Sequence, residues 1–507
     1  MSSAKTGHMR VRKEVLYGRR LKAHNSMTYS AVILGAGVSG LCMGRALLMA
    51  GIKSFVIIEK SEGIGGTWWD TTYPGAECDV PAHLYSYSFD LNPDWSQVYA
   101  PRHEIQQYLV QFAEKSGLLP HIRFSTTLIQ ARFDEQTALW HLQLGNGDQL
   151  MARTFVCSAA PLSEPKYPDI PGVGTFQGRL FHSARWDRNY RFCGTRVAVI
   201  GTAASAVQLI PRIAPLVSEL YVYQRSPAWI VPRMNRRYSR WEKTLFRMKP
   251  VARARRGFTY VIHEMNRLAF NPGSLMGKIG RGLAELQLRR QVPDKTLRAA
   301  LRPDYPFGCK RVLLSNDYYP ALMRSNVKLV TAPIERLDPT GILSSDGQRR
   351  EIDAIICATG FNVKHVLTSI RIVGLDGKSL NEAWINEPEA YRGVTVAGFP
   401  NLFLLLGPNT GQGHTSAILF IEAQVNYALQ CIQELSRLNK KFLDVKRDAM
   451  TRYNEVMQKT LHSSVWAGGC RSWYKTETGK IIGIYPGFSF QYMRELRKPH
   501  FEDYIIG

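Results

Sequence analysis

Glycine residues near the start of the chain have the spacing that binds the pyrophosphate of a dinucleotide. Gly35, Gly37 and Gly40 follow a short apolar run, residues 29–34, that is expected to form a strand. Gly35 allows the tight turn, Gly37 lets backbone amides approach the pyrophosphate, and Gly40 lets the next helix pack closely on the strand. Glu59 ends the second expected strand, where a carboxylate binds ribose hydroxyls and repels a 2′-phosphate. This unit is therefore predicted to bind FAD or NAD.

A second unit of the same kind begins at Gly201, after an expected strand at 196–200. Its second strand is followed by Arg225 and Ser226 instead of an acid. A cation and a hydroxyl suit a 2′-phosphate, so this unit is predicted to bind NADPH. Ala203 takes the place of the middle glycine, where its methyl group would crowd the pyrophosphate. A unit that packs but binds no nucleotide is therefore the alternative.

The stretch between these units carries a longer motif. Type I Baeyer-Villiger monooxygenases share the pattern FxGxxxHxxxW followed by Pro or Asp, and the chain matches it at Phe176, Gly178, His182, Trp186 and Asp187. Further matches are GGTWWDTTYPGAECDVPAHLYSYSF, YPFGCKR, CATGF, SVWAGGCRSWY and YPG. The chain resembles this family over residues 28 to 507. The N-oxygenating flavin monooxygenases differ at the end of the motif, which makes the Trp186-Asp187 ending discriminating.

The resemblance implies which residues contact the two cofactors. The implied FAD contacts are Gly35, Gly37, Gly40, Glu59, Gly66, Thr67, Trp68, Asp79 and Tyr85. The implied NADPH contacts are Gly201, Thr202, Ser205, Arg225, Ser226 and Lys310, with Lys310 and Arg225 sharing the 2′-phosphate. No metal site is indicated.

The resemblance also implies a catalytic pair, Arg311 and Asp79. A guanidinium keeps its proton at working pH, so Arg311 can stabilise the negative charge of a C4a-peroxyflavin, while Asp79 orients it. His182 and Trp186 are interpreted as a linker element that positions the NADPH domain. The implied reaction consumes NADPH and O₂ and converts a ketone to an ester or lactone.

Two other functions stay open at this point. A heteroatom monooxygenase acting on amines or sulfides uses the same oxygenating intermediate, and a catalytically impaired flavoprotein would account for Ala203. A flavin disulfide reductase shares the two-nucleotide plan but needs a cysteine pair beside the flavin, and no CxxC or CxxxxC occurs. Neither the ketone nor the oligomeric state can be read from the sequence.

The order of these motifs predicts an α/β protein with two Rossmann-like domains, one inserted into the other. We expect a basic N-terminal extension (1–27), an FAD-binding domain in two parts (28–165 and 355–507), and between them the NADPH-binding domain (166–354). A basic helical insertion at 236–300 interrupts the NADPH-binding domain. The Pro-rich stretch 161–174 and the ATG motif near Ala358 mark the two crossings.

Charge and cysteine usage limit the partners and the setting. The 507 residues carry a net charge of +24, and residues 1–30 and 236–300 contribute +6 and +12 of it. No DNA-binding or RNA-binding signature accompanies this charge, so nucleic acid is not expected as a partner. A solvated basic face and peripheral contact with an anionic membrane both stay open. The eight cysteines are scattered singly, which indicates no disulfide framework and favours a reducing, cytoplasmic setting.

Overall fold

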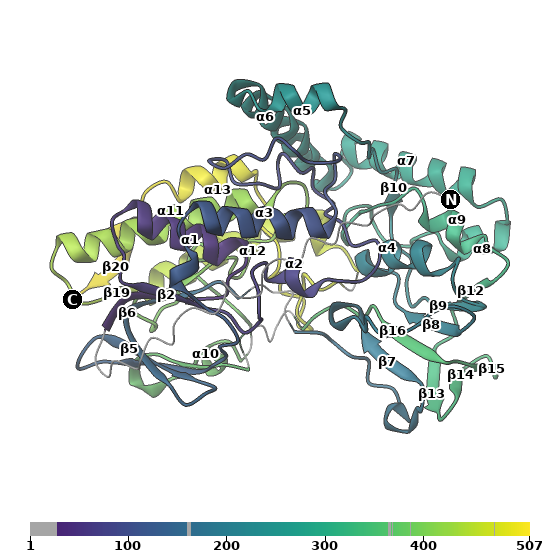
Figure 1. Ribbon diagram of the computed structural model, residues 1–507, viewed down its shortest axis with the longest axis horizontal. Coiled ribbons are helices and arrows are strands. Elements are labelled where there is room, and N and C mark those ends of the chain that lie inside the picture. The colour runs from purple at the N-terminus through teal and green to yellow at the C-terminus, as the bar shows by residue number, and fades with distance from the viewer. Residues whose placement is uncertain (1–27, 160–163, 363–366, 368, 386, 471) are drawn as a thin grey trace, which may run out of the picture.

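A computed structural model describes residues 28–159, 164–362, 367, 369–385, 387–470 and 472–507. Within these residues the chain forms two large sheets, and most of the helices lie on one side of them (Figure 1). The expected N-terminal extension and part of the Pro-rich crossing lie outside the described residues. None of the described helices is both long and apolar enough to span a bilayer.

The first sheet has eight strands. They are β1 (Thr28–Leu34), β2 (Phe55–Ile58), β3 (Ile122–Arg123), β4 (Leu128–Asp134), β5 (Leu139–Leu144), β6 (Gln149–Cys157), β17 (Arg371–Val373) and β18 (Leu402–Leu404). β1 pairs in parallel with β2 and β6, so the carboxyl ends of these strands meet at one edge. β17 pairs with β4 and β18 with β6, which means that the chain returns to this sheet after the second unit.

The second sheet is parallel and has the order β12, β9, β8, β16, β7. Its strands are β7 (Arg179–His182), β8 (Arg196–Ile200), β9 (Glu219–Tyr223), β12 (Val327–Val330) and β16 (Ala354–Cys357). The expected domain boundary at 354/355 falls on β16. Because β16 pairs with both β7 and β8, the whole strand lies in the second sheet, and the chain crosses back only after Cys357.

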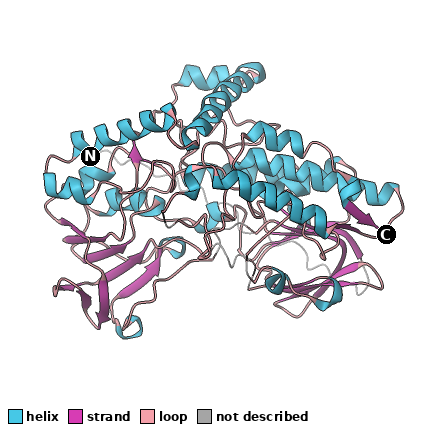
Figure 2. Ribbon diagram, turned by 180° about the vertical axis from the view of Figure 1, so that it is seen from behind, coloured by secondary structure: helices cyan, strands magenta, loops and turns pink. Residues whose placement is uncertain are grey.

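The remaining strands form small sheets. They are β10 (Ile230–Val231) with β11 (Leu313–Leu314), β13 (Ile334–Asp338) with β14 (Gly341–Ser344) and β15 (Arg349–Glu351), and β19 (Leu443–Val445) with β20 (Tyr504–Ile506). The helices outside the insertion are α1 (Val38–Met49), α2 (Thr67–Asp70), α3 (Arg102–Lys115), α4 (Ala204–Ile213), α9 (Tyr318–Leu322), α10 (Leu380–Ala383), α11 (Ala417–Arg437), α12 (Arg447–His462) and α13 (Ser489–Glu495). Figure 2 shows from behind that the helices again lie above the two sheets.

The expected helical insertion is present. It consists of α5 (Arg240–Phe246), α6 (Lys249–Met265), a 3-10 turn (Asn266–Phe270), α7 (Leu275–Gln291) and α8 (Lys295–Ala300). Although it follows strands of the second unit, α6 and the turn contact the first. Arg267 donates a hydrogen bond to the carbonyl of Pro486, and the Phe270 ring lies 4.8 Å from the Trp466 ring. The insertion therefore spans both units.

Each unit has its own apolar core. The first core is built around β1, β2, β6 and the helices α1 and α11, and the second around β8, β9 and α4. Tyr73 and Ala76 belong to the second core although they come from a loop of the first unit. This loop, residues 72–77, ties the two units together beside the site.

Candidate active site

The first glycine turn has the backbone geometry that the sequence predicts. Gly35 has φ +100° and donates its N–H to the carbonyl of Ile58 at 2.8 Å. A Cβ atom on Gly40 would lie 1.9 Å from the Gly35 carbonyl oxygen, so helix α1 can approach the turn only with glycine there. No side chain caps the N-terminus of α1. Its first N–H groups are the donors that a pyrophosphate would use.

Glu59 lies directly after β2 and is buried. Its Oε2 accepts a hydrogen bond from the Ala36 amide at 2.7 Å, and its Oε1 accepts one from the Ser61 amide at 2.8 Å. The carboxylate therefore holds the glycine turn in place. Because each carboxylate oxygen can accept a second hydrogen bond, the expected contact with ribose hydroxyls is still available.

Other predicted FAD residues lie in a loop that contacts this turn. Gly66, the residue before Thr67 and helix α2, lies against Gly37, since a Cβ atom on Gly66 would be 3.1 Å from the Gly37 Cα. Trp68 donates its indole N–H to the Tyr85 hydroxyl at 3.0 Å. Arg102, which the sequence did not single out, donates to the carbonyls of Trp68 and Trp69 and so fixes this loop.

The second glycine turn repeats the first. Gly201 has φ +112°, and a Cβ atom there would lie 2.4 Å from the Ala358 carbonyl oxygen. Ala203 has φ −88° and ψ −165°, against −88° and −168° for Gly37. This is extended backbone that any residue adopts, and the Ala203 methyl group is exposed. The alanine therefore leaves the turn undistorted, which weakens the case for a unit that cannot bind nucleotide.

The predicted 2′-phosphate group of residues is assembled around Ser226. Lys310 Nζ donates to the Ser226 hydroxyl at 2.8 Å, and the Thr202 hydroxyl donates to the Ser226 carbonyl at 3.0 Å. The pKa of Lys310 is lowered, first by burial and then by the nearby Arg225 guanidinium. The positive charges of Lys310 and Arg225 repel each other, and a phosphate bound between them would stabilise both.

Arg311 forms an ion pair with Asp79 across the two units. Its Nε and Nη2 lie 2.8 and 2.6 Å from Asp79 Oδ2. The carboxylate raises the pKa of Arg311, so the guanidinium stays charged. About a third of each side chain is exposed, 33% for Arg311 and 30% for Asp79. Because Asp79 engages only part of the guanidinium, the remaining N–H groups can face a reacting group.

Tyr474 lies beside this pair. Burial raises the pKa of its hydroxyl, while the Arg311 guanidinium acts in the opposite direction. The residue comes from the motif SVWAGGCRSWY, which the sequence marked without assigning Tyr474 a role. Its position in the motif was the only available signal.

Hydrogen bonds from the 72–77 loop fix the distance between the two nucleotide units. The Tyr73 hydroxyl donates to Gln208 Oε1 on α4 at 2.8 Å, and Gln208 Nε2 donates to the Glu77 carbonyl at 2.9 Å. Arg233 pairs with the Glu77 carboxylate at 2.5 Å and donates to the Cys78 carbonyl. These contacts hold Asp79, two residues beyond Glu77, opposite Arg311. Sequence reasoning missed them, although Tyr73 and Glu77 lie in a recognised motif.

Known proteins with this arrangement identify the family. The model for flavin-binding monooxygenase-like proteins matches residues 29–380. A Baeyer-Villiger monooxygenase of Streptomyces coelicolor is 41% identical over 479 residues, which cover 94% of this chain and 92% of the relative. One of Pseudomonas aeruginosa is 42% identical over 463 residues, covering 91% and 88%. This chain belongs to the Baeyer-Villiger monooxygenases.

Solved structures agree with this assignment. The structure of OTEMO in complex with FAD and NADP superposes with a TM-score of 0.85 at 28% identity, covering 95% of this chain and all of that chain. The predicted family and the predicted α/β fold with two dinucleotide-binding domains are thereby confirmed. The enzyme is a flavin monooxygenase. The roles of the individual site residues stay predictions.

His182 and Trp186 of the family motif lie where the chain crosses between the units. The His182 ring is buried and makes edge contacts with Tyr167 and Phe361, which come from the two crossings. Burial lowers the pKa of His182 to about 4, so the imidazole is neutral at physiological pH. The Trp186 ring packs against Phe181 of β7. These contacts support the interpretation as a linker element.

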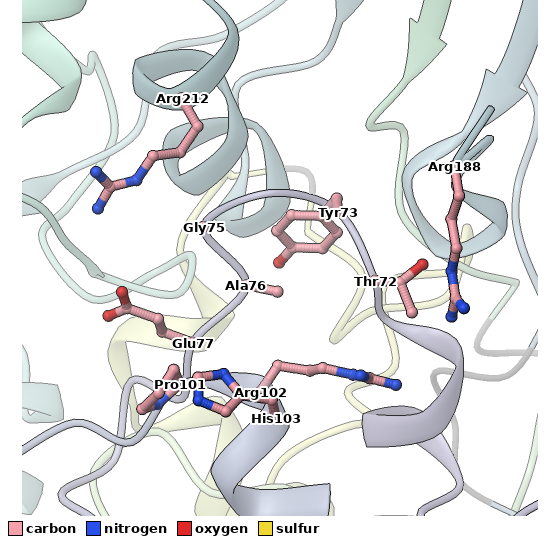
Figure 3. A pocket seen from close by; sticks show the side chains of 10 residues that line it. All are labelled: Thr72, Tyr73, Gly75, Ala76, Glu77, Pro101, Arg102, His103, Arg188 and Arg212. Atoms are coloured by element: carbon pink, nitrogen blue, oxygen red, sulfur yellow. The ribbon is translucent and has the colours of Figure 1, made fainter. Parts of the chain in front are cut away.

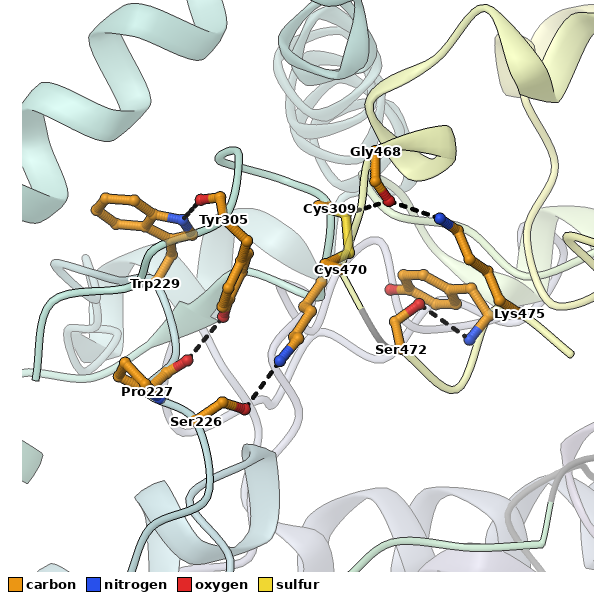
Figure 4. The surroundings of a disulfide bond; sticks show 11 residues. Ser226, Pro227, Trp229, Tyr305, Cys309, Gly468, Cys470, Ser472 and Lys475 are labelled. Carbon is orange, nitrogen blue, oxygen red and sulfur yellow. Dashed lines mark hydrogen bonds between the residues drawn. A yellow bond between two sulfur atoms is a disulfide. The ribbon is translucent and has the colours of Figure 1, made fainter. Parts of the chain in front are cut away.

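A disulfide corrects one expectation from the sequence. The scattered cysteines indicated no disulfide framework, but Cys309 and Cys470 are bonded, so the reducing setting loses that support (Figure 4). The two residues are 161 positions apart, and only the tertiary fold brings them together. The bond ties the residue before Lys310 to the C-terminal loop that carries Tyr474. The other six cysteines are free.

We predict that Cys470→Ser destabilises the enzyme. Cross-linking over this separation removes unfolded-state entropy worth about 5 kcal/mol. The melting temperature of Cys470→Ser should therefore fall by several degrees and no longer respond to reductant, whereas that of the parent should fall when reductant is added. Cys193→Ser, at an exposed free thiol, is the matched control. A reductant-insensitive parent would contradict the prediction.

We predict that Lys310→Ala weakens NADPH binding specifically. A charge-assisted contact with the 2′-phosphate contributes about 1.5–3 kcal/mol, so KM for NADPH should rise roughly 10-fold to 100-fold with a smaller change in kcat. NADH lacks the 2′-phosphate and serves as the control substrate. Equal losses with NADH and NADPH would show that Lys310 acts elsewhere.

A pocket of about 450 Å³ lies between the two units. Arg188 and Arg212 line it together with the loop 72–77 and Arg102 (Figure 3). Arg212 is in the last turn of α4, at the opposite end from Ala203. The pocket therefore lies at the seam between the units, where Tyr73 bonds Gln208 of α4.

Proposed function

We propose that the enzyme uses FAD, NADPH and O₂ to convert a ketone to an ester or lactone. Family membership supports this reaction, and the solved relative in complex with FAD and NADP supports the two cofactors. The observation that carries the proposal is the Arg311–Asp79 pair, which stands between the two predicted nucleotide units with about a third of each side chain exposed. When bound and reduced by NADPH, FAD supplies activated oxygen for such a reaction.

The residues present fit both cofactors. The first turn leaves the N-terminus of α1 uncapped by side chains and places the buried Glu59 beside it. The second turn has the same backbone geometry, and Lys310, Arg225 and Ser226 gather where a 2′-phosphate would lie. The difference between an acid in the first unit and cations in the second supports FAD in one and NADPH in the other.

Arg311 would stabilise negative charge at the reacting atoms. Its guanidinium remains protonated because Asp79 raises its pKa, and Asp79 holds it in one orientation through Nε and Nη2. A fixed cation in a partly enclosed place stabilises developing charge without reorganising at the moment of reaction. Tyr474 and Tyr85 lie close to the pair, and Trp68 bonds Tyr85.

The test is product analysis with labelled dioxygen. Purified enzyme, NADPH and a panel of ketones should yield esters or lactones that contain one labelled oxygen atom. Parallel reactions with sulfides and amines separate this proposal from a heteroatom monooxygenase. Oxidation of NADPH with no oxygen inserted into any ketone would refute the proposal.

The location of the enzyme is a separate matter. Peripheral contact with an anionic membrane remains a proposal. The predicted nucleotide-binding residues explain only a small part of the basic charge that motivates it. Arg225, Lys310 and Arg311 serve the predicted site, but residues 236–300 alone contribute +12 to the net charge.

A further inference from the structure

The helical insertion exposes large apolar side chains on three consecutive helices. They are Trp241 and Leu245 on α5, Phe258, Val261, Ile262 and Met265 on α6, and Leu275, Ile279, Leu283 and Leu286 on α7, each between 39% and 72% exposed. We call these residues the insertion surface. Single exposed apolar residues are common, but a group of this size marks a place where a protein meets a partner or a membrane.

Helix α6 shows that this exposure is a property of the fold. Its exposed apolar residues are spaced three and four apart between Phe258 and Met265, so they form one stripe. The buried residues of the same helix include Arg256 and Glu264. The helix therefore turns charged side chains toward the protein and its apolar stripe outward, the reverse of an ordinary surface helix.

The two buried charged residues of α6 are held by hydrogen bonds within the protein. Arg256 Nη1 donates to the carbonyls of His83, Leu84 and Ser86 at 2.7–3.0 Å. Glu264 accepts a hydrogen bond from Ser489 at 2.5 Å. These contacts fix the rotation of α6, so the apolar stripe cannot turn inward without leaving both charges unpaired.

The insertion is also strongly basic. Residues 240–291 contain twelve Lys and Arg residues and three acidic residues. All three acidic residues interact with other residues of the protein. Glu242 pairs with Arg236, and Glu264 accepts a hydrogen bond from Ser489. Glu285 pairs with Arg281 and Arg302. The helices therefore present an excess of positive charge beside the apolar stripes.

We propose that the insertion surface binds an anionic membrane. Helices that combine apolar and basic side chains lie at the lipid interface, where apolar groups enter the acyl boundary and Lys and Arg reach the headgroups. α5, α6 and α7 lie along one edge of the molecule in both views, away from the two sheets (Figures 1 and 2). A second copy of the chain would bring two basic surfaces together, so charge favours lipid over self-association.

Co-sedimentation with vesicles tests this surface. The full-length enzyme should bind phosphatidylcholine vesicles that contain phosphatidylserine, should bind pure phosphatidylcholine vesicles far more weakly, and should be released by high salt. Val261 and Arg253 are both exposed on α6. Val261→Asp and Arg253→Glu should each lower the partition coefficient at least about five-fold, the factor expected for one charge at such a membrane. Both variants should retain the parent's bound flavin and its activity on a water-soluble ketone.

Matched changes on another helix provide the controls. Val456 is 67% exposed and Lys459 is also exposed, both on α12. Val456→Asp and Lys459→Glu should leave vesicle binding within about two-fold of the parent. Equal effects of the α6 and α12 substitutions would overturn the proposal. Complete loss of vesicle binding on removal of residues 1–26 would also overturn it. If the parent enzyme does not bind vesicles but forms a dimer, and Val261→Asp dissociates that dimer, the surface serves self-association instead.

Discussion

Arg311→Ala is expected to lower the rate of product formation by about 10²–10³, while the protein keeps its fold and its flavin. The reason is the loss of a fixed cation at the point where negative charge develops. Lysine should not restore the full rate, because a single ammonium group cannot hold the Asp79 carboxylate and face the reacting group as the planar guanidinium does. The measurement is the amount of product formed per enzyme per unit time, read by mass detection.

An arginine outside the site gives the matched control for this change. Arg452 on α12 also pairs with an aspartate, Asp448, at 2.6 Å, but its side chain is 63% exposed. Arg452→Ala should change the rate less than about two-fold, since an exposed ion pair contributes little. If Arg311→Ala forms ester at the parental rate, the catalytic role assigned to Arg311 is wrong.

Gly40→Ala is expected to give a protein that purifies without FAD. The added Cβ would lie 1.9 Å from the Gly35 carbonyl oxygen and 2.9 Å from the Ser158 hydroxyl. The Gly35 carbonyl is a backbone group and cannot rotate away as a side chain could. Helix α1 must therefore move away from the turn that would hold the pyrophosphate. The ratio of flavin absorbance to protein absorbance measures the loss, and far-ultraviolet circular dichroism checks the fold.

Gly282→Ala separates a local effect from a general one. Gly282 is also a helical glycine, on α7, and a Cβ there meets no atom within 4 Å. Because alanine favours the helix by about 0.5–1 kcal/mol, this variant should keep its flavin and be at least as stable as the parent. A flavin content in Gly40→Ala equal to that of Gly282→Ala would contradict the role of the first turn.

Local backbone chemistry was predictable from the sequence. The expected strand at 196–200 is β8, and the expected strand at 29–34 is β1, which begins one residue earlier, at Thr28. Glycine spacing indicates such turns because glycine tolerates the positive φ found at Gly35 and Gly201. At Gly40 the requirement is space, because a Cβ atom there would meet the Gly35 carbonyl oxygen. The return to the first sheet near the ATG motif was also expected, but the expected boundary at 354/355 falls within β16, and the chain crosses back only after Cys357.

Contacts between distant segments required the tertiary structure. Arg311 and Asp79 are 232 positions apart, and the resemblance to a family named them without showing what brings them together. The Tyr73–Gln208 contact, the Arg233–Glu77 pair and the Cys309–Cys470 bond do that, and none leaves a periodic or compositional signal. Isolated cysteines in a sequence look the same whether or not they meet.

The basic insertion shows the same division most clearly. The sequence by itself determined that residues 236–300 form helices with both apolar and basic side chains, because helical periodicity is a local property. It did not determine which side of each helix faces the protein. That was decided by the hydrogen bonds of Arg256 to the 83–86 loop and of Glu264 to Ser489, since two buried charges must be satisfied before an apolar stripe can be buried.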